Sequence, residues 1–211
     1  MDILDSILRF FQNGGVFMYP ILIILGLGLA ITIERMIYLR RAHSETRILW
    51  SKMLPLVNQG QYEAAEQMAS GSSTAIGRVL GYGIARSRVA SATRSDVELA
   101  MEESLMEAAP QLERRTRYLA TFANIATLLG LLGTIIGLIH AFAALSDISP
   151  AEKQDQLSAA VSIAMSCTAF GLMVAIPFLL LHAWLQGITD DLIDNLEIAA
   201  VKFLNSLGLK N

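Results

Sequence analysis

The chain has 211 residues, of which 54% are hydrophobic and 17% are charged, and its formal net charge at pH 7 is −3. That hydrophobic share exceeds what a soluble domain of this length usually carries, so the composition predicts a polytopic membrane protein. The charges are mixed along the chain without a basic face, which argues against a nucleic-acid partner.

Three windows contain no Asp, Glu, Lys or Arg over the roughly 20 residues that a membrane helix needs, namely residues 10–33, 118–146 and 156–189. The fold class predicted is therefore an all-α membrane protein with three transmembrane helices. At about 1.5 Å per residue the last two windows measure roughly 43 and 51 Å, beyond the ~30 Å hydrocarbon layer. We expect these two helices to extend into a cytoplasmic helical bundle.

Lys and Arg in the loops set the orientation. Eleven of the 16 lie between Arg40 and Arg117, and the excess predicts that this segment is cytoplasmic. In chain order we expect an amphipathic periplasmic helix at 1–13, a first transmembrane helix at 14–39, a cytoplasmic helical region at 40–117, a second transmembrane helix at 118–146, a periplasmic loop at 147–157, a third transmembrane helix at 158–185 and a cytoplasmic C-terminal helix at 186–211.

The N-terminal segment places Ile3, Leu4, Ile7, Leu8 and Phe11 on one side, as in a helix at the membrane surface. The alternative is that these residues begin the first span. Pro20 suits the first turn of that span. We expect the span to be retained, because no small-residue cleavage site follows it before Arg40.

Two interruptions divide the cytoplasmic region. The sequence SGSS at 70–73 predicts a turn between helices, and a second break is expected near 91–94. Ser95 and Glu98 have the spacing of a capping box, which would start a helix at Asp96. Little stops that helix before Ser146, so we expect one helix of about 50 residues, roughly 75 Å long, with a kink at Pro110.

The usual enzyme constellations are missing from the sequence. His43, His140 and His182 do not have metal-ligand spacing with one another or with Cys167, the one cysteine. A phosphate-binding loop and a nucleophile elbow are also lacking. We expect no metal, no cofactor and no enzymatic activity, and a structural role for His140.

Two of the spans carry stripes of small and hydroxyl residues. The seven-residue spacing of Thr127 and Thr134 puts them on one side of the second span. The other members are Ala126, Gly130, Gly133 and Gly137 in the second span, and Ser158, Ser162, Ala164, Ser166, Thr168, Gly171 and Ala175 in the third. Glycines at this spacing permit close helix packing, and a hydroxyl most often bonds to its own helix. Aligned hydroxyls are alternatively suited to lining a narrow wet path.

These segments are recognisable together. LLGLLGTIIG, followed by SCTAFGLMVAIP, resembles the two signature membrane segments of the MotA/TolQ/ExbB proton-channel family, and FMYPILIILGLGLAITIERMIYLRRA resembles its first span. The three-span form is similar to the ExbB/TolQ branch. The resemblance implies a homo-oligomeric ring, with five subunits expected, in a bacterial inner membrane. It also implies an ExbD/TolR-like single-span partner that supplies a membrane aspartate, and a TonB- or TolA-like protein that carries the motion onward.

In that family the threonines equivalent to Thr134 and Thr168 face the central pore, and we add Thr127 from the shared stripe. Gly130, Gly133, Gly137 and Gly171 are expected to pack helices. Family members of this branch commonly carry a glutamate where this chain has Ile163. The interiors of the predicted spans contain no Asp or Glu, so this chain supplies no buried carboxylate to relay protons.

Two hypotheses follow. In the first, the chain is the ring subunit of an ion-driven motor, using H⁺ or Na⁺, that energises an envelope process such as TonB-dependent uptake or Tol-Pal function. Small faces on two spans, which one three-helix unit cannot fully cover, support the ring. In the second, it is a non-conducting membrane scaffold with a cytoplasmic interaction bundle. A solute transporter is less favoured, since inverted repeats and broken helices are not visible.

Overall fold

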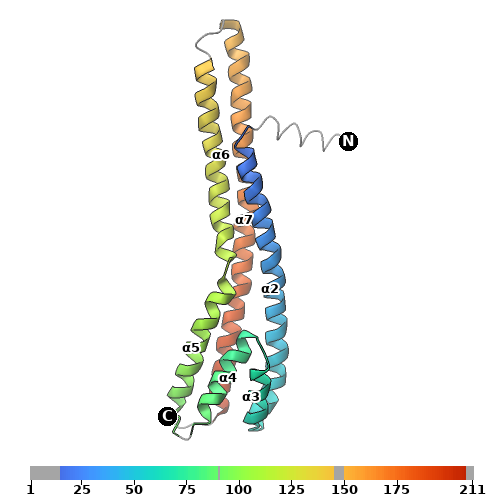
Figure 1. Ribbon diagram of the computed structural model, residues 1–211, viewed down its shortest axis with the longest axis vertical. Coiled ribbons are helices and arrows are strands. Elements are labelled where there is room, and N and C mark those ends of the chain that lie inside the picture. Colours follow the sequence, from blue (N-terminus) through green and yellow to red (C-terminus); the bar gives the residue numbers. More distant parts are fainter. Residues whose placement is uncertain (1–14, 90, 145–149, 208–211) are drawn as a thin grey trace, which may run out of the picture. The chain divides into compact units, whose positions relative to one another are not determined.

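The computed structural model describes residues 15–89, 91–144 and 150–207, and within these ranges the chain forms helices and no strand. The helices are α2 (Met18–Asn58), α3 (Tyr62–Ser70), α4 (Ala75–Ser87), α5 (Arg94–Glu113), α6 (Thr116–Ala144) and α7 (Pro150–Ser206), shown in Figure 1. Three helical stretches are long and apolar enough to cross a membrane: Met18–Asn58, Arg94–Ala143 and Lys153–Ser206. The prediction of an all-helical chain with three candidate spans is confirmed.

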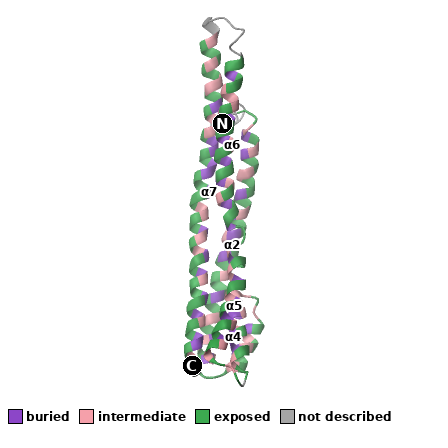
Figure 2. Cartoon of the chain, turned by 90° about the vertical axis from the view of Figure 1, so that its left-hand side faces the viewer, coloured by how far each residue is buried: buried purple, intermediate pink, exposed green. Residues whose placement is uncertain are grey.

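The chain divides into two compact units, to which α2 and α7 both contribute. Unit 1 comprises residues up to 33 together with 115–183, and unit 2 comprises residues 34–114 and those from 184 onward. Buried and exposed residues alternate along the helices of each unit, as Figure 2 shows. Each unit thus has its own buried face.

The core of unit 1 joins α2, α6 and α7. Met18 and Ile21 of α2 cluster with Ala126 of α6 and with Phe170 and Phe178 of α7. The outward faces are equally apolar. Ile23, Leu128 and Leu180 are 63%, 62% and 67% exposed, which suits contact with lipid better than contact with water.

The core of unit 2 is built where α4, α5 and α7 meet. A Cβ atom at Gly83 of α4 would lie 2.6 Å from the Met101 sulfur of α5 and 3.2 Å from a ring carbon of Phe203 in α7. Met101 and Phe203 are both buried. Glycine therefore lets α4 approach its two neighbours closely.

The predicted single helix from Asp96 to Ser146 is wrong. The helix ends at Glu113, Arg114 has φ −51° and ψ 136°, and Arg115 has a left-handed φ of 68° before α6 starts at Thr116. Pro110, the expected kink, lies inside α5. The sequence reading missed the break because the turn contains neither glycine nor proline, the residues that usually mark one.

The start of α5 also differs from expectation. Thr93, rather than Ser95, is the N-cap: its hydroxyl accepts from the Asp96 amide at 3.3 Å, and the Asp96 carboxylate accepts from the Thr93 amide at 2.9 Å. Arg86 lies 3.3 Å from the same carboxylate. Thr93 and Asp96 have the same three-residue spacing as Ser95 and Glu98, and the ion pair with Arg86 adds to the box that forms.

The turn at SGSS is confirmed, since α3 ends at Ser70 and α4 begins at Ala75. Pro20 lies in the first turn of α2, as predicted. Residues 150–157, which we expected in the periplasmic loop, are helical because α7 begins with Pro150, a residue favoured at helix starts. The expected helix at 1–13 falls outside the described residues.

Candidate functional site

Helices α6 and α7 approach each other backbone to backbone at Gly130 and Gly171. A Cβ atom on Gly171 would lie 2.6 Å from the carbonyl oxygen of Ala126, and one on Gly130 would lie 3.1 Å from the Thr168 Cα. Real Cβ atoms essentially never come within 3.0 Å of another heavy atom. The missing side chains therefore create this close approach, as in other membrane helix pairs with small residues at the contact.

The same contact continues along α6. A Cβ atom placed on Gly133 would overlap the Cys167 sulfur, and one placed on Gly137 would lie 3.0 Å from the Ala164 Cβ. These glycines thus face α7 of the same chain. At these positions α7 of the same chain covers the small face of α6.

Thr168 bridges the two helices at this contact. Its hydroxyl donates a hydrogen bond of 2.8 Å to the Gly130 carbonyl oxygen, 38 residues away in sequence. Thr168 is half-buried. The bond is available because Gly130 carries no side chain between its carbonyl and α7.

The other two predicted hydroxyls bond within α6. Thr134 donates to the Leu131 carbonyl at 2.6 Å, and Thr127 donates to the Ala123 carbonyl at 3.0 Å. Thr134 is half-buried and Thr127 is exposed. The structure therefore links Thr168 to Gly130 rather than to Thr134.

All three threonines share one chemical property. A hydroxyl has a single proton to donate and two lone pairs that accept. Here each proton is directed to a backbone carbonyl. In this arrangement the three oxygens can still accept hydrogen bonds from an incoming donor.

Ile163, which stands where the family resemblance implies a glutamate, is 41% exposed. Its side chain is near Gly15, where a Cβ atom would lie 3.8 Å from the Ile163 Cγ2 methyl carbon. Within the described ranges, no group of three His, Cys, Asp or Glu side chains is placed to hold a metal ion. The arrangement on α6 and α7 offers neutral polar groups in an apolar setting.

Arg35 is a residue whose role the sequence reading missed. It is 2% exposed, donates to the Leu112 carbonyl at the end of α5 and lies 4.9 Å over the Tyr38 ring. It thus satisfies a carbonyl that α5 leaves open where the helix stops. One signal in the sequence is that Arg35 lies four residues before Leu39, which places both on one face of the helix, and Leu39 is also buried.

The comparisons with known proteins agree on one family. The model of the MotA/TolQ/ExbB proton channel family matches residues 71–198. A putative biopolymer transport protein ExbB homolog of Methanothermobacter thermautotrophicus is 28% identical over 204 residues, 94% of this chain and 69% of the relative. The ExbB-like 1 protein of Synechocystis sp. is 30% identical over 186 residues, 87% of this chain and 72% of the relative. TolQ of Haemophilus influenzae, a Tol-Pal system protein, is 38% identical over 78 residues, 37% of this chain and 34% of the relative.

Proposed function

Because the chain belongs to the MotA/TolQ/ExbB proton channel family, we propose that it is the ring subunit of an ion-driven motor in a bacterial inner membrane. The observation that carries the proposal is the family match over residues 71–198, which includes all of α6 and the apolar part of α7. The motor energises an envelope process of the TonB-dependent or Tol-Pal kind. The N-terminus is periplasmic and the C-terminus cytoplasmic.

The ring contains five copies and surrounds a single-span ExbD/TolR-like partner, which supplies a membrane aspartate. A carboxylate from another chain is needed because the interiors of the predicted spans of this chain contain no Asp or Glu. Thr134, Thr168 and Thr127 line the ion path. A TonB- or TolA-like protein receives the motion.

The hydrogen bonds of the threonines indicate which form of the partner carboxyl they favour. Since their protons are directed to backbone carbonyls, their oxygens accept a hydrogen bond from a protonated carboxyl. An ionised carboxylate can only accept, so it finds no donor in these hydroxyls and is also disfavoured by the apolar surroundings. The lined path therefore holds the acid protonated until it reaches water.

This preference supplies a gate. A proton that crosses 100 mV releases about 2.3 kcal/mol, which drives motion only if the ion cannot leak past the acid. A carboxyl that moves along the path when neutral, and halts when ionised, couples each transfer to a displacement. Leu131, Leu138 and Leu172 form the apolar seal in this proposal.

The test uses Thr134→Val and Thr168→Val, which keep the shape of the side chain and remove the acceptor. Each variant is co-expressed with an ExbD/TolR-like single-span partner, and proton flux is measured in proteoliposomes. Loss of one hydrogen bond to a buried polar group costs about 1–3 kcal/mol, so we expect flux to fall at least about fivefold. Thr→Ser at either site should retain flux.

Thr121→Val is the matched control, because Thr121 is an exposed α6 threonine bonded to its own helix through the Arg117 carbonyl. It should leave flux unchanged. Full flux in the Thr134→Val, Thr168→Val double variant would remove the two hydroxyls from the mechanism. No flux in the wild-type complex would favour the non-conducting scaffold instead.

The ring is tested separately by native mass spectrometry of the protein extracted in mild detergent. We expect one closed oligomer of five copies, alone or with its partner. A spectrum containing only monomers would contradict the ring.

A further inference from the structure

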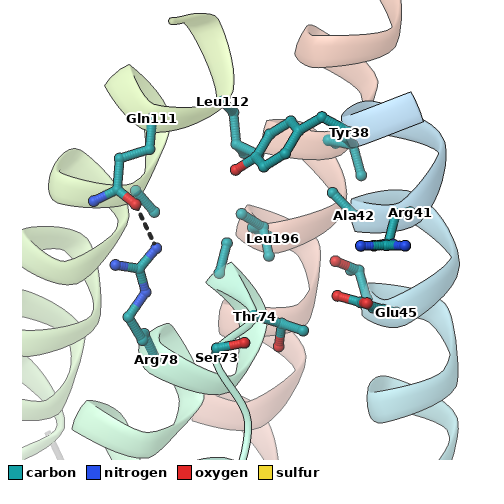
Figure 3. Close-up of a pocket in the computed structure, with 14 residues that line it drawn as sticks. Tyr38, Arg41, Ala42, Glu45, Ser73, Thr74, Arg78, Gln111, Leu112 and Leu196 are labelled. Atoms are coloured by element: carbon teal, nitrogen blue, oxygen red, sulfur yellow. Dashed lines mark hydrogen bonds between the residues drawn. The ribbon is translucent and has the colours of Figure 1, made fainter. Parts of the chain in front are cut away.

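Unit 2 contains a cavity of about 180 Å³ among helices α2, α4, α5 and α7, shown in Figure 3. Its apolar part includes the buried side chains of Leu112, Leu192 and Leu196. Its polar part includes two arginines, Arg41 and Arg78, and one acid, Glu45. None of the threonines assigned to the ion path lines it, so it needs an explanation of its own.

Arg78 extends from α4, and its guanidinium makes one hydrogen bond while another of its donors has no acceptor in the described part of the chain. One terminal nitrogen donates 2.8 Å to the Gln111 side-chain oxygen, as the dashed line in Figure 3 marks. The Nε atom is buried and has no hydrogen-bond partner among the described residues. A buried donor without an acceptor is unfavourable, and a bound oxygen atom would relieve it.

A second source of positive potential lies at the start of α4. Thr74 is the N-cap, its hydroxyl accepts from the Gly77 amide at 3.1 Å, and Ser73 and Ala75 also line the cavity. The first amides of a helix have no acceptor inside it, and the helix dipole makes that end partly positive. This end of α4 therefore adds amide donors beside Arg78.

We propose that this cavity binds a phosphate group. Guanidinium groups pair with phosphate oxygens through two parallel hydrogen bonds, and helix N-termini commonly hold the same anion. The volume of about 180 Å³ is well above what a single water needs, and it leaves room for one phosphate group with ordered waters. Arg41 and Arg78 outnumber Glu45, so the lining carries net positive charge.

The phosphate group belongs either to a soluble phosphate ester or to the headgroup of an anionic lipid. A lipid headgroup is within reach because the first span is predicted to end at residue 39, two residues before Arg41. Both sources use the same oxygens and the same arginines, and the experiment separates them.

The experiment measures binding of inorganic phosphate to the full chain in an uncharged detergent by isothermal titration, at constant ionic strength. We expect a Kd in the millimolar range, weakened at least about fivefold by Arg41→Gln and by Arg78→Gln, since each removes a charge-assisted hydrogen-bond donor. Arg40→Gln is the matched control, since Arg40 is an exposed arginine on the same helix that does not line the cavity. It should bind phosphate as the wild type does.

Glu45→Gln supplies a result that misfolding cannot imitate. Removing the one lining carboxylate should tighten phosphate binding severalfold, because it removes a like charge near the anion. No phosphate binding at about 20 mM, above the millimolar range expected for a weak site, would overturn the proposal. Equal affinities in Arg40→Gln and Arg41→Gln, or weaker binding in Glu45→Gln, would overturn it as well.

A second arm adds phosphatidylglycerol to the detergent micelles. If it competes with phosphate in the wild type but not in Arg41→Gln, the site is occupied by a lipid headgroup. If phosphate binds and the lipid does not compete, the ligand is a soluble phosphate. Either result supports the phosphate site and assigns its source.

Discussion

Replacing Gly171 by alanine is expected to push helices α6 and α7 apart. The new Cβ atom would lie 2.6 Å from the Ala126 carbonyl oxygen and 3.2 Å from the Gly130 Cα, and both neighbours are backbone atoms that no rotamer change can move. Ordinary contact begins at 3.4 Å. The helices must therefore separate locally by about 0.8 Å, or the helix must bend.

That separation would also break the bridge between the helices. The hydrogen bond from Thr168 to Gly130, 2.8 Å long, would stretch to about 3.6 Å, which is outside hydrogen-bonding range. Overpacking costs about 1–3 kcal/mol, and hydrogen bonds between membrane helices contribute about 0.6 kcal/mol on average. Alanine regains up to about 1 kcal/mol of helix propensity over glycine. The expected net loss is about 1–3 kcal/mol.

The assay is thermal unfolding of the purified protein in mild detergent, followed by circular dichroism at one fixed scan rate. For a chain of this size, where 1 kcal/mol shifts the Tm by about 2–4 °C, we expect the Tm to fall by about 2–12 °C. Gly187→Ala is the matched control on the same helix, where a Cβ atom would have nothing within 4 Å. It should leave the Tm unchanged or slightly higher. Equal Tm values for the two variants would refute the close approach of α6 and α7.

Three further predictions concern single residues. Thr93→Ala removes the N-cap of α5 and should lower the free energy of unfolding by about 0.5–2 kcal/mol in urea titrations, whereas Thr93→Ser should restore most of it. The pKa of Asp96 is held below its usual value, first by the hydrogen bond from the Thr93 amide, then by the Thr93 hydroxyl and by Arg86. A pKa that is lowered in the folded state stabilises the fold at pH values above the unfolded-state pKa, near 3.8, and this contribution is lost as the pH falls below that value. The stability advantage of the wild type over Asp96→Asn should therefore shrink below about pH 4. A difference in stability that stays constant with pH would contradict this prediction. His140→Gln should retain most proton flux in proteoliposomes, and complete loss with an intact ring would assign proton access to the exposed His140 side chain.

Features that depend on near neighbours in the chain were predictable from the sequence. The three candidate spans followed from charge-free length, and the turn before α4 followed from SGSS, because hydropathy and turn preference act over a few residues. The bonds of Thr127 and Thr134 to their own helix were also the ordinary expectation for hydroxyls in a membrane helix. The capping box at Thr93 and Asp96 could not be predicted in preference to one at Ser95 and Glu98, because the residue spacing is the same in both.

Partners distant in sequence were decided by the tertiary structure. Whether the Thr168 hydroxyl bonds to its own helix or to Gly130 depends on how α6 and α7 are rotated about their axes, which residue spacing alone does not fix. The stop after Glu113 has no local breaker, and Arg35, 77 residues from Leu112, supplies a donor to the open end of α5. A buried arginine is stable there because its guanidinium finds both a carbonyl and the Tyr38 ring. These contacts form only when segments far apart in the chain have packed.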